Sequence, residues 1–145
     1  AEESMSARWF PDDMPAPMAD RDTQAWWEAA AQERLVVQEC SDCRRLRHPP
    51  GPLCPGCRSS QFGWRKMSGR GQVYTYTVVH RPASARQADQ LPFIIAAIEL
   101  DDAEGIRMVS NLVEIEPDDV KVGTPVRVVW EKMSSELSIP RFRPV

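Results

Sequence analysis

The sequence predicts a mainly β protein with one N-terminal helix and a metal-binding ribbon. Its four cysteines fall into two Cys-x2-Cys pairs, and from Gln72 onward apolar and polar residues alternate in runs separated by turn residues. A helical spacing of apolar residues occurs near residues 20–34. The chain has 145 residues, of which 42% are hydrophobic and 27% charged, so its size and composition are those of one globular domain.

Residues 1–19 are expected to form a Pro-rich arm or linker, because prolines recur there without helical or strand spacing. The arm also carries large apolar side chains that solvent would leave exposed. We therefore expect Trp9, Phe10 and Met14 to pack on the domain's own surface or on a partner. The alternative is a chain end that lies in solvent.

The segment 20–39 is predicted to hold the helix and a lead-in strand. Asp20 or Thr23 can cap a helix that runs to about Arg34, with Trp26 and Trp27 in its apolar stripe. The lead-in strand covers residues 35–39, and the alternating pattern then predicts four strands at residues 72–79, 93–100, 106–113 and 126–131.

The C-terminal residues 138–145 are expected to form an irregular apolar strip, because Pro140 and Pro144 cannot continue a central strand. Phe142 lies between Arg141 and Arg143 there, an arrangement typical of an aromatic anchor in an interface. The alternative is a frayed terminus.

The four cysteines are the most specific feature. Cys40, Cys43, Cys54 and Cys57 can direct four thiolates at one tetrahedral ion. Such a closed shell leaves no position for water or substrate, so we expect a structural zinc ion in a ribbon over residues 40–68. The alternatives are two disulfides, a rubredoxin-like iron centre and a dithiol redox pair. His48 is not required as a ligand.

The ribbon is also basic. Residues 40–71 contain seven cationic side chains and a single carboxylate, Asp42. Arginine matches phosphate oxygens, so these side chains are candidate contacts for a nucleotide phosphate or a partner, or else a solvated surface. The cations are Arg44, Arg45, Arg47, Arg58, Arg65, Lys66 and Arg70.

Several function classes are disfavoured by the sequence. A net charge of −3 argues against a general nucleic-acid binder. The sequence shows neither a long apolar run nor a signal-peptide pattern, and we expect a cytoplasmic protein. It contains no Gly-x-Ser-x-Gly, phosphate-loop or His-Glu-x-x-His motif, so we expect a non-catalytic protein.

The chain resembles the DUF thirty-five (DUF35) family. The resemblance rests on the Trp26-Trp27 helix, the cysteine pairs around His48-Pro49-Pro50, the Ser68-Gly69-Arg70-Gly71 turn and the strands that follow. It implies a rubredoxin-like zinc ribbon with the four cysteines as zinc ligands, followed by a C-terminal OB-fold β-barrel over residues 69–145. It also implies an accessory subunit of acyl-CoA enzymes that docks on a thiolase-fold partner.

Within this family the chain is similar to the domain attached to the MaoC-like enoyl-CoA hydratase of actinobacterial steroid side-chain degradation, which associates with a thiolase-like aldolase. The resemblance implies that a retro-aldolase partner performs the chemistry on a CoA thioester and that no catalytic residue lies in this chain. We expect the basic ribbon to face the CoA phosphates, because arginine matches phosphate oxygens. Candidate interface residues are Trp9, Phe10, Met14, Trp26, Trp27 and Phe142.

Two other functions stay open from the sequence. Zinc ribbons and OB barrels both bind single-stranded nucleic acids, and Trp64, Tyr74 and Tyr76 could stack on bases. The other is a stand-alone thioesterase or hydratase, which requires an active site that the sequence does not reveal.

Overall fold

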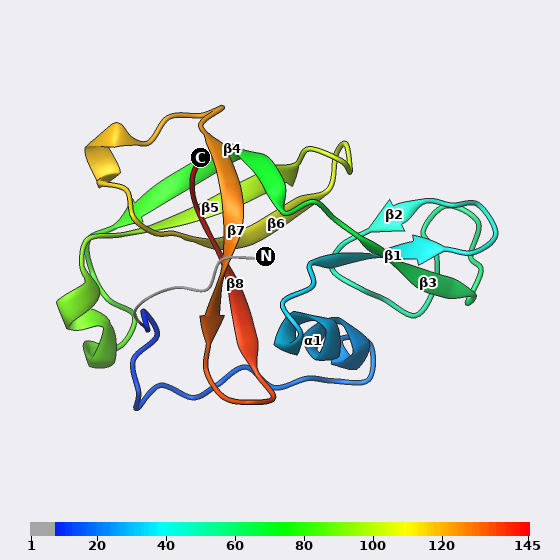
Figure 1. Ribbon diagram of the computed structural model, residues 1–145, viewed down its shortest axis with the longest axis horizontal. Helices are drawn as coiled ribbons and strands as arrows, with labels where there is room; N and C mark the ends of the chain where they lie inside the picture. The colour runs from blue at the N-terminus through cyan, green and yellow to red at the C-terminus, as the bar shows by residue number, and fades with distance from the viewer. Residues whose placement is uncertain (1–7) are drawn as a thin grey trace.

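The computed structural model describes residues 8–145, which form a small β ribbon and a β-barrel with a helix between them (Figure 1). The first seven residues of the predicted arm lie outside the described residues. The elements are α1 (Gln24–Ala31), β1 (Val36–Cys40), β2 (Leu46–Arg47), β3 (Phe62–Lys66), β4 (Arg70–Val79), β5 (Phe93–Leu100), β6 (Arg107–Leu112), β7 (Pro125–Lys132) and β8 (Ser138–Pro144), with two 3₁₀ turns, η1 (Ala85–Gln90) and η2 (Pro117–Asp119). None of the helices in residues 8–145 has the length and apolar character that a membrane crossing requires.

The ribbon contains a three-stranded antiparallel sheet in which β1 lies between β2 and β3. All five residues of β1 are buried. Val36 pairs with Lys66 at the barrel end of the sheet, and Cys40 pairs with Phe62 at the other end. The register of β1 and β3 therefore places the first cysteine pair at the tip of the ribbon, away from the barrel (Figure 1).

The barrel closes in the order β4-β5-β6-β8-β7, with β7 pairing back to β4. Its pairs are antiparallel except for β6 and β8, which run parallel and meet at Leu112 and Phe142. This closed barrel of five strands, preceded by the ribbon, confirms the predicted fold class.

Two glycines allow the barrel to begin where it does. A Cβ atom at Gly71 would lie 2.5 Å from the Glu99 carbonyl oxygen, so only glycine lets β4 approach β5 this closely. Gly69 has φ of +82°, and a Cβ atom there would lie 2.5 Å from Val128 Cγ1. The Ser68-Gly69-Arg70-Gly71 turn is thus a steric requirement of barrel closure.

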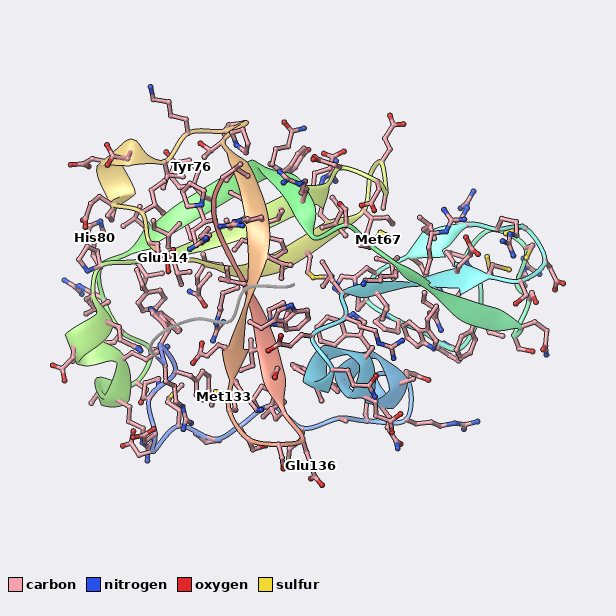
Figure 2. All side chains as sticks on the ribbon, viewed as in Figure 1. Met67, Tyr76, His80, Glu114, Met133 and Glu136 are labelled. Atoms are coloured by element: carbon pink, nitrogen blue, oxygen red, sulfur yellow. The ribbon has the colours of Figure 1, made fainter. Side chains whose placement is uncertain are left out.

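One hydrophobic core joins the helix, the base of the ribbon and the barrel. Trp26 and Ala30 of α1 pack in the same cluster as Leu35 and Met67, and the barrel interior continues that cluster. Figure 2 shows Met67 where the ribbon meets the barrel, and this side chain is 2% exposed. Because the core is continuous, the base of the ribbon is held rigidly on the barrel.

The helix is shorter than the pattern predicts. It ends at Ala31, because Glu33 takes a left-handed conformation with φ of 58° and the Arg34 N–H returns to the Ala29 carbonyl at 3.0 Å. The Asp20 carboxylate accepts the N–H groups of Asp22 and Thr23 in the turn before the helix. Thr23 is the N-cap residue but makes no side-chain cap bond.

The prediction of an irregular C-terminal strip is wrong. Residues 138–144 form β8, which pairs with β7 along its whole length. The carbonyl groups of Pro140 and Phe142 face β6, where they accept the Ser110 hydroxyl at 2.6 Å and the Val113 N–H at 2.8 Å. The absent N–H groups of both prolines therefore face β6, where pairing is limited to one residue pair, so the prolines do not interrupt the pairing with β7.

Candidate functional site

Two turns of the same shape hold the four cysteines. In the first, the Arg44 N–H donates to the Cys40 carbonyl at 3.0 Å, and in the second the Arg58 N–H donates to the Cys54 carbonyl at 2.9 Å. Arg44 and Arg58 share a left-handed φ of 65°. Each turn thus directs its two sulfurs to the same side of the backbone, and the two turns face each other across the ribbon tip.

The sulfur positions fit a tetrahedral zinc ion. Cys40 Sγ lies 3.6 Å from Cys57 Sγ, Cys43 Sγ lies 3.5 Å from Cys54 Sγ, and all four sulfurs lie within 4.8 Å of one another. Zinc–sulfur bonds of about 2.3 Å in a tetrahedron place the sulfurs about 3.8 Å apart. None of the four cysteines forms a disulfide. Four thiolates complete the shell, so the ion would stabilise the ribbon without an open position for chemistry.

The electrostatics of the cluster also favour a cation. Backbone N–H groups of Cys57 and Gly56 direct hydrogen bonds at Cys54 Sγ and lower its pKa to about 6. The Ser59 N–H also favours the Cys57 thiolate, but the bond to Cys40 Sγ and burial outweigh it and raise the pKa of Cys57 to about 12. Four thiolates at this spacing repel one another, and a divalent ion removes that repulsion.

Several cations of the predicted basic surface bind groups of the chain itself. Glu39 forms ion pairs with Arg44, at 3.1 Å, and with Arg65. Arg47 is buried and donates to the Gly51 carbonyl at 3.0 Å. The Arg45 guanidinium packs over Gly56 in the second cysteine turn. The seven cations therefore do not converge on one point, although Arg45 and Arg58 remain exposed beside the cysteines.

The candidate interface residues on α1 differ in exposure. Trp26 is 8% exposed, and its indole N–H donates to the Val36 carbonyl at 3.0 Å. Trp27 meets Trp26 edge to face, with ring centroids 4.8 Å apart, and is half-buried. Trp26 is therefore a core residue that joins the helix to the ribbon, whereas Trp27 keeps exposed surface.

Phe142 is not a surface anchor, which corrects the prediction. Its side chain is fully buried inside the barrel, in the same core cluster as Trp130. The alternation of β8 directs Phe142 inward, so it stabilises the barrel and offers no surface to a partner.

The arm lies against the barrel where the structure describes it. The Trp9 ring packs on Phe93 with centroids 5.5 Å apart, and the Phe10 N–H donates to the Glu131 carboxylate. Further along, Arg86 Nε donates to Asp13 at 3.0 Å. Met14 is half-buried, and its N–H donates to the Pro11 carbonyl.

A buried polar network beneath the arm was not predicted from the sequence. Arg141 Nε donates to Glu131 at 2.9 Å, and Arg141 Nη1 donates to the Asn111 side-chain oxygen at 2.9 Å. Burial lowers the pKa of Arg141, and the bond to Glu131 opposes that shift. The signal in the sequence was Glu131, an acidic residue in a valine-rich strand. Its pairing with Arg141 could not be predicted, because that pairing depends on the register of β7 and β8.

The aromatic residues considered for base stacking do not form one platform. Tyr76 packs against the core and donates its hydroxyl to the Val120 carbonyl at 3.1 Å. Tyr74 lies on the outside of the barrel, where the Arg107 guanidinium covers its ring at 3.7 Å. Trp64 is on the ribbon, edge to face with Phe62.

Family models match both parts of the chain. Residues 27–63 match the rubredoxin-like zinc ribbon domain of ChsH2, and residues 64–131 match the C-terminal OB-fold domain of ChsH2. Three protein relatives agree with this. The chain is 46% identical to a probable enoyl-CoA hydratase alpha subunit of Thermomonospora curvata over 90% of its length, and 34% identical to a DUF35 domain-containing scaffold protein of Methanocaldococcus jannaschii over 78% of its length.

The third relative is the 3-oxo-4,17-pregnadiene-20-carboxyl-CoA hydratase alpha subunit of Mycobacterium tuberculosis, with 36% identity over 83% of this chain. The chain spans only 40% and 37% of the two hydratase subunits but 79% of the scaffold protein. Among solved structures, a chain of the Ltp2-ChsH2(DUF35) aldolase superposes with a TM-score of 0.80 and 44% identity, covering 89% of this chain and 98% of that one.

Proposed function

This chain belongs to the DUF35 family, whose ChsH2 members join a rubredoxin-like zinc ribbon to an OB-fold barrel, and we propose that it is a non-catalytic scaffold of an acyl-CoA enzyme complex. One observation carries the proposal. The fold and 44% of the residues agree with a chain of the Ltp2-ChsH2(DUF35) aldolase over 98% of that chain. The four-cysteine site supports a structural role, because its thiolates leave the metal no open position.

The partner in this proposal is a thiolase-fold retro-aldolase, which breaks a carbon–carbon bond in a steroid side-chain CoA thioester. The aldolase name of the structural relative supports the reaction, and the pregnadiene carboxyl-CoA name of the mycobacterial relative supports the substrate class. An associated or fused MaoC-like hydratase is also part of the proposal, because two relatives are hydratase alpha subunits of which this chain matches about two fifths.

Co-expression of this chain with the thiolase-like aldolase of the same organism tests the proposal. We expect the two proteins to elute together in size-exclusion chromatography and the aldolase to lose activity when this chain is absent. An aldolase that elutes alone and is fully active would contradict the scaffold function. The purified chain is also titrated with a labelled single-stranded nucleic acid. Binding of this strand at low salt would favour the nucleic-acid alternative instead.

For the CoA thioester, we propose that Arg45 and Arg58 contact the phosphates, because both are exposed at the ribbon tip. Arg44, Arg47 and Arg65 bind groups of this chain. The double substitution Arg45→Ala and Arg58→Ala should weaken acyl-CoA binding by the complex. It should also make the affinity for acyl-CoA depend less on salt concentration. Arg21→Ala, at an exposed arginine in the turn before α1, is the control, and equal affinities in all variants would contradict a phosphate contact.

A further inference from the structure

A cavity of about 450 Å³ lies between α1, the His48–Pro50 turn and the outer surface of the barrel. Trp27 and Pro49 border it on one side, and Met108, Val109 and Ile139 border it on the other. This volume is within the range of about 300–1,000 Å³ that ligand pockets occupy, and an apolar lining with few polar groups is typical of them.

Arg141 is one of the polar residues in this lining, with Thr23, His48, Ser110 and Asn111. Its Nε and Nη1 are fixed by Glu131 and Asn111, and the residue is 6% exposed. Among residues 8–145 Nη2 makes no hydrogen bond, and this nitrogen is not fully buried. The side chain is therefore rigid, and its remaining nitrogen keeps donor capacity for a group that enters from outside.

The same residue borders a second cavity of about 380 Å³ near Val79 and Phe10. The two cavities share Ile95, Asn111 and Arg141. The Trp9 ring of the arm lies over Arg141, 4.9 Å from the guanidinium carbon to the ring centroid. Arg141 therefore borders both cavities, and the arm covers one face of its guanidinium.

The charges select a class of ligand. Glu131 is 1% exposed and neutralises Arg141, so the site as a whole has no net charge. An anionic group at Nη2 would lie close to the buried Glu131 carboxylate, and a cationic group would lie close to Arg141. Both arrangements bring like charges together. A neutral carbonyl oxygen accepts a hydrogen bond from Nη2 without this repulsion.

We propose that this cavity binds a small neutral ligand with a rigid apolar ring body and a carbonyl group, with the ring against Trp27 and Val109 and the carbonyl oxygen at Arg141 Nη2. This inference goes beyond the scaffold function and does not depend on it. The contacts that carry it are the unpartnered donor, the neutral ion pair and the aromatic wall of the cavity.

Prodan, a neutral fluorescent naphthalene that carries a ketone, is the test probe with the zinc-loaded full chain. We expect saturable binding with one probe per chain and a blue-shifted emission. Val109→Glu places a carboxylate in the apolar wall and should weaken binding by about tenfold or more. Val122→Glu is the matched control, because both valines are 69% exposed and Val122 does not border the cavity.

Two further probes test the role of Arg141. The dimethylaminonaphthalene without the ketone should bind more weakly than Prodan, and so should anilinonaphthalene sulfonate, which is anionic. Absence of Prodan binding, equal affinity of the probe without the ketone, tighter binding of the sulfonate, or equal affinity of both valine variants would each overturn the inference.

The same variants separate this inference from the scaffold function. Loss of aldolase assembly in Val109→Glu, together with a wild-type chain that does not bind Prodan, would identify the cavity as a protein interface and overturn the ligand site. Prodan binding by a chain that does not assemble with the aldolase would contradict the scaffold function and leave the ligand site supported.

Discussion

His48 illustrates how burial changes the chemistry of a single residue. It is half-buried between α1 and the ribbon, with its ring 6.0 Å from that of Trp26. Desolvation lowers the pKa of His48 below the ordinary value of 6.5, because the charged form loses hydration. The folded protein therefore favours neutral His48, and the unfolded chain binds a proton more readily near pH 6.

This predicts a pH dependence with a defined sign. The contribution of neutral His48 to the free energy of unfolding is present above pH 6.5 and is lost as the pH falls through the lowered pKa. We expect the decrease in stability between about pH 7.5 and pH 5.5 to be smaller in His48→Gln than in wild type, measured by urea unfolding with saturating zinc. His80→Gln changes an exposed residue at the barrel end away from the ribbon (Figure 2) and should keep the wild-type decrease; equal curves for all three proteins would contradict the prediction.

At the scale of elements, the arm is a structural part of the barrel surface. Its contacts reach β5 through Phe93, β7 through Glu131 and η1 through Arg86. Trp9 also lies over Arg141, so one ring covers both an apolar residue and a buried cation. The described part of the arm thus contacts three separate elements of the barrel region.

Trp9→Ala should lower the free energy of unfolding by about 1–3 kcal/mol, because it removes a half-buried aromatic ring and a cation–π contact. Met18→Ala in the same arm is the control, since Met18 is 89% exposed and its removal should change stability by no more than about 0.5 kcal/mol. Chemical denaturation of both variants measures the difference. Equal stabilities would mean that the described arm contacts contribute nothing in solution.

The strand β8 makes the second prediction at this scale. Phe142→Ala leaves a cavity inside the barrel and should cost about 3–5 kcal/mol of stability. Val145→Ala, one residue after the strand and 68% exposed, should be nearly neutral. Thermal and urea unfolding test this, and a Phe142→Ala variant with wild-type stability would contradict the placement of β8 in the barrel.

On the scale of the whole molecule, two sources of stability act at opposite ends. The barrel and the base of the ribbon share one hydrophobic core, whereas the tip depends on the four cysteines. The tip contains short turns and exposed side chains such as Leu53 and Phe62, at 57% and 43% exposure. Metal removal should therefore act locally.

We expect about one zinc ion per chain by metal analysis. Chelation should increase hydrogen exchange in residues 40–62 while the barrel strands stay protected. Cys57→Ser should reproduce this change without chelator, and Ser41→Ala, at a non-ligand position in the first turn, should not. Stoichiometric iron, or a ribbon that keeps full protection without metal, would contradict a structural zinc site.

The sequence by itself determined the features that depend on local spacing. The two Cys-x2-Cys pairs identified the metal site. The alternation of apolar and polar residues located four strands, and the bounds predicted for one of them, residues 93–100, are those of β5. The apolar composition of the arm also suggested that Trp9 and Phe10 pack on a surface, since large apolar side chains are costly in water.

Tertiary structure decided the features that depend on residues far apart in the chain. The strand β8 exists because β7 provides its hydrogen bonds and because the absent N–H groups of Pro140 and Pro144 face the short pairing with β6. The short ribbon strands β2 and β3 form because β1 pairs with both. Arg141 is likewise buried because Glu131 lies beside it on the neighbouring strand, and a single strand's sequence contains no information about which charge faces it across the sheet.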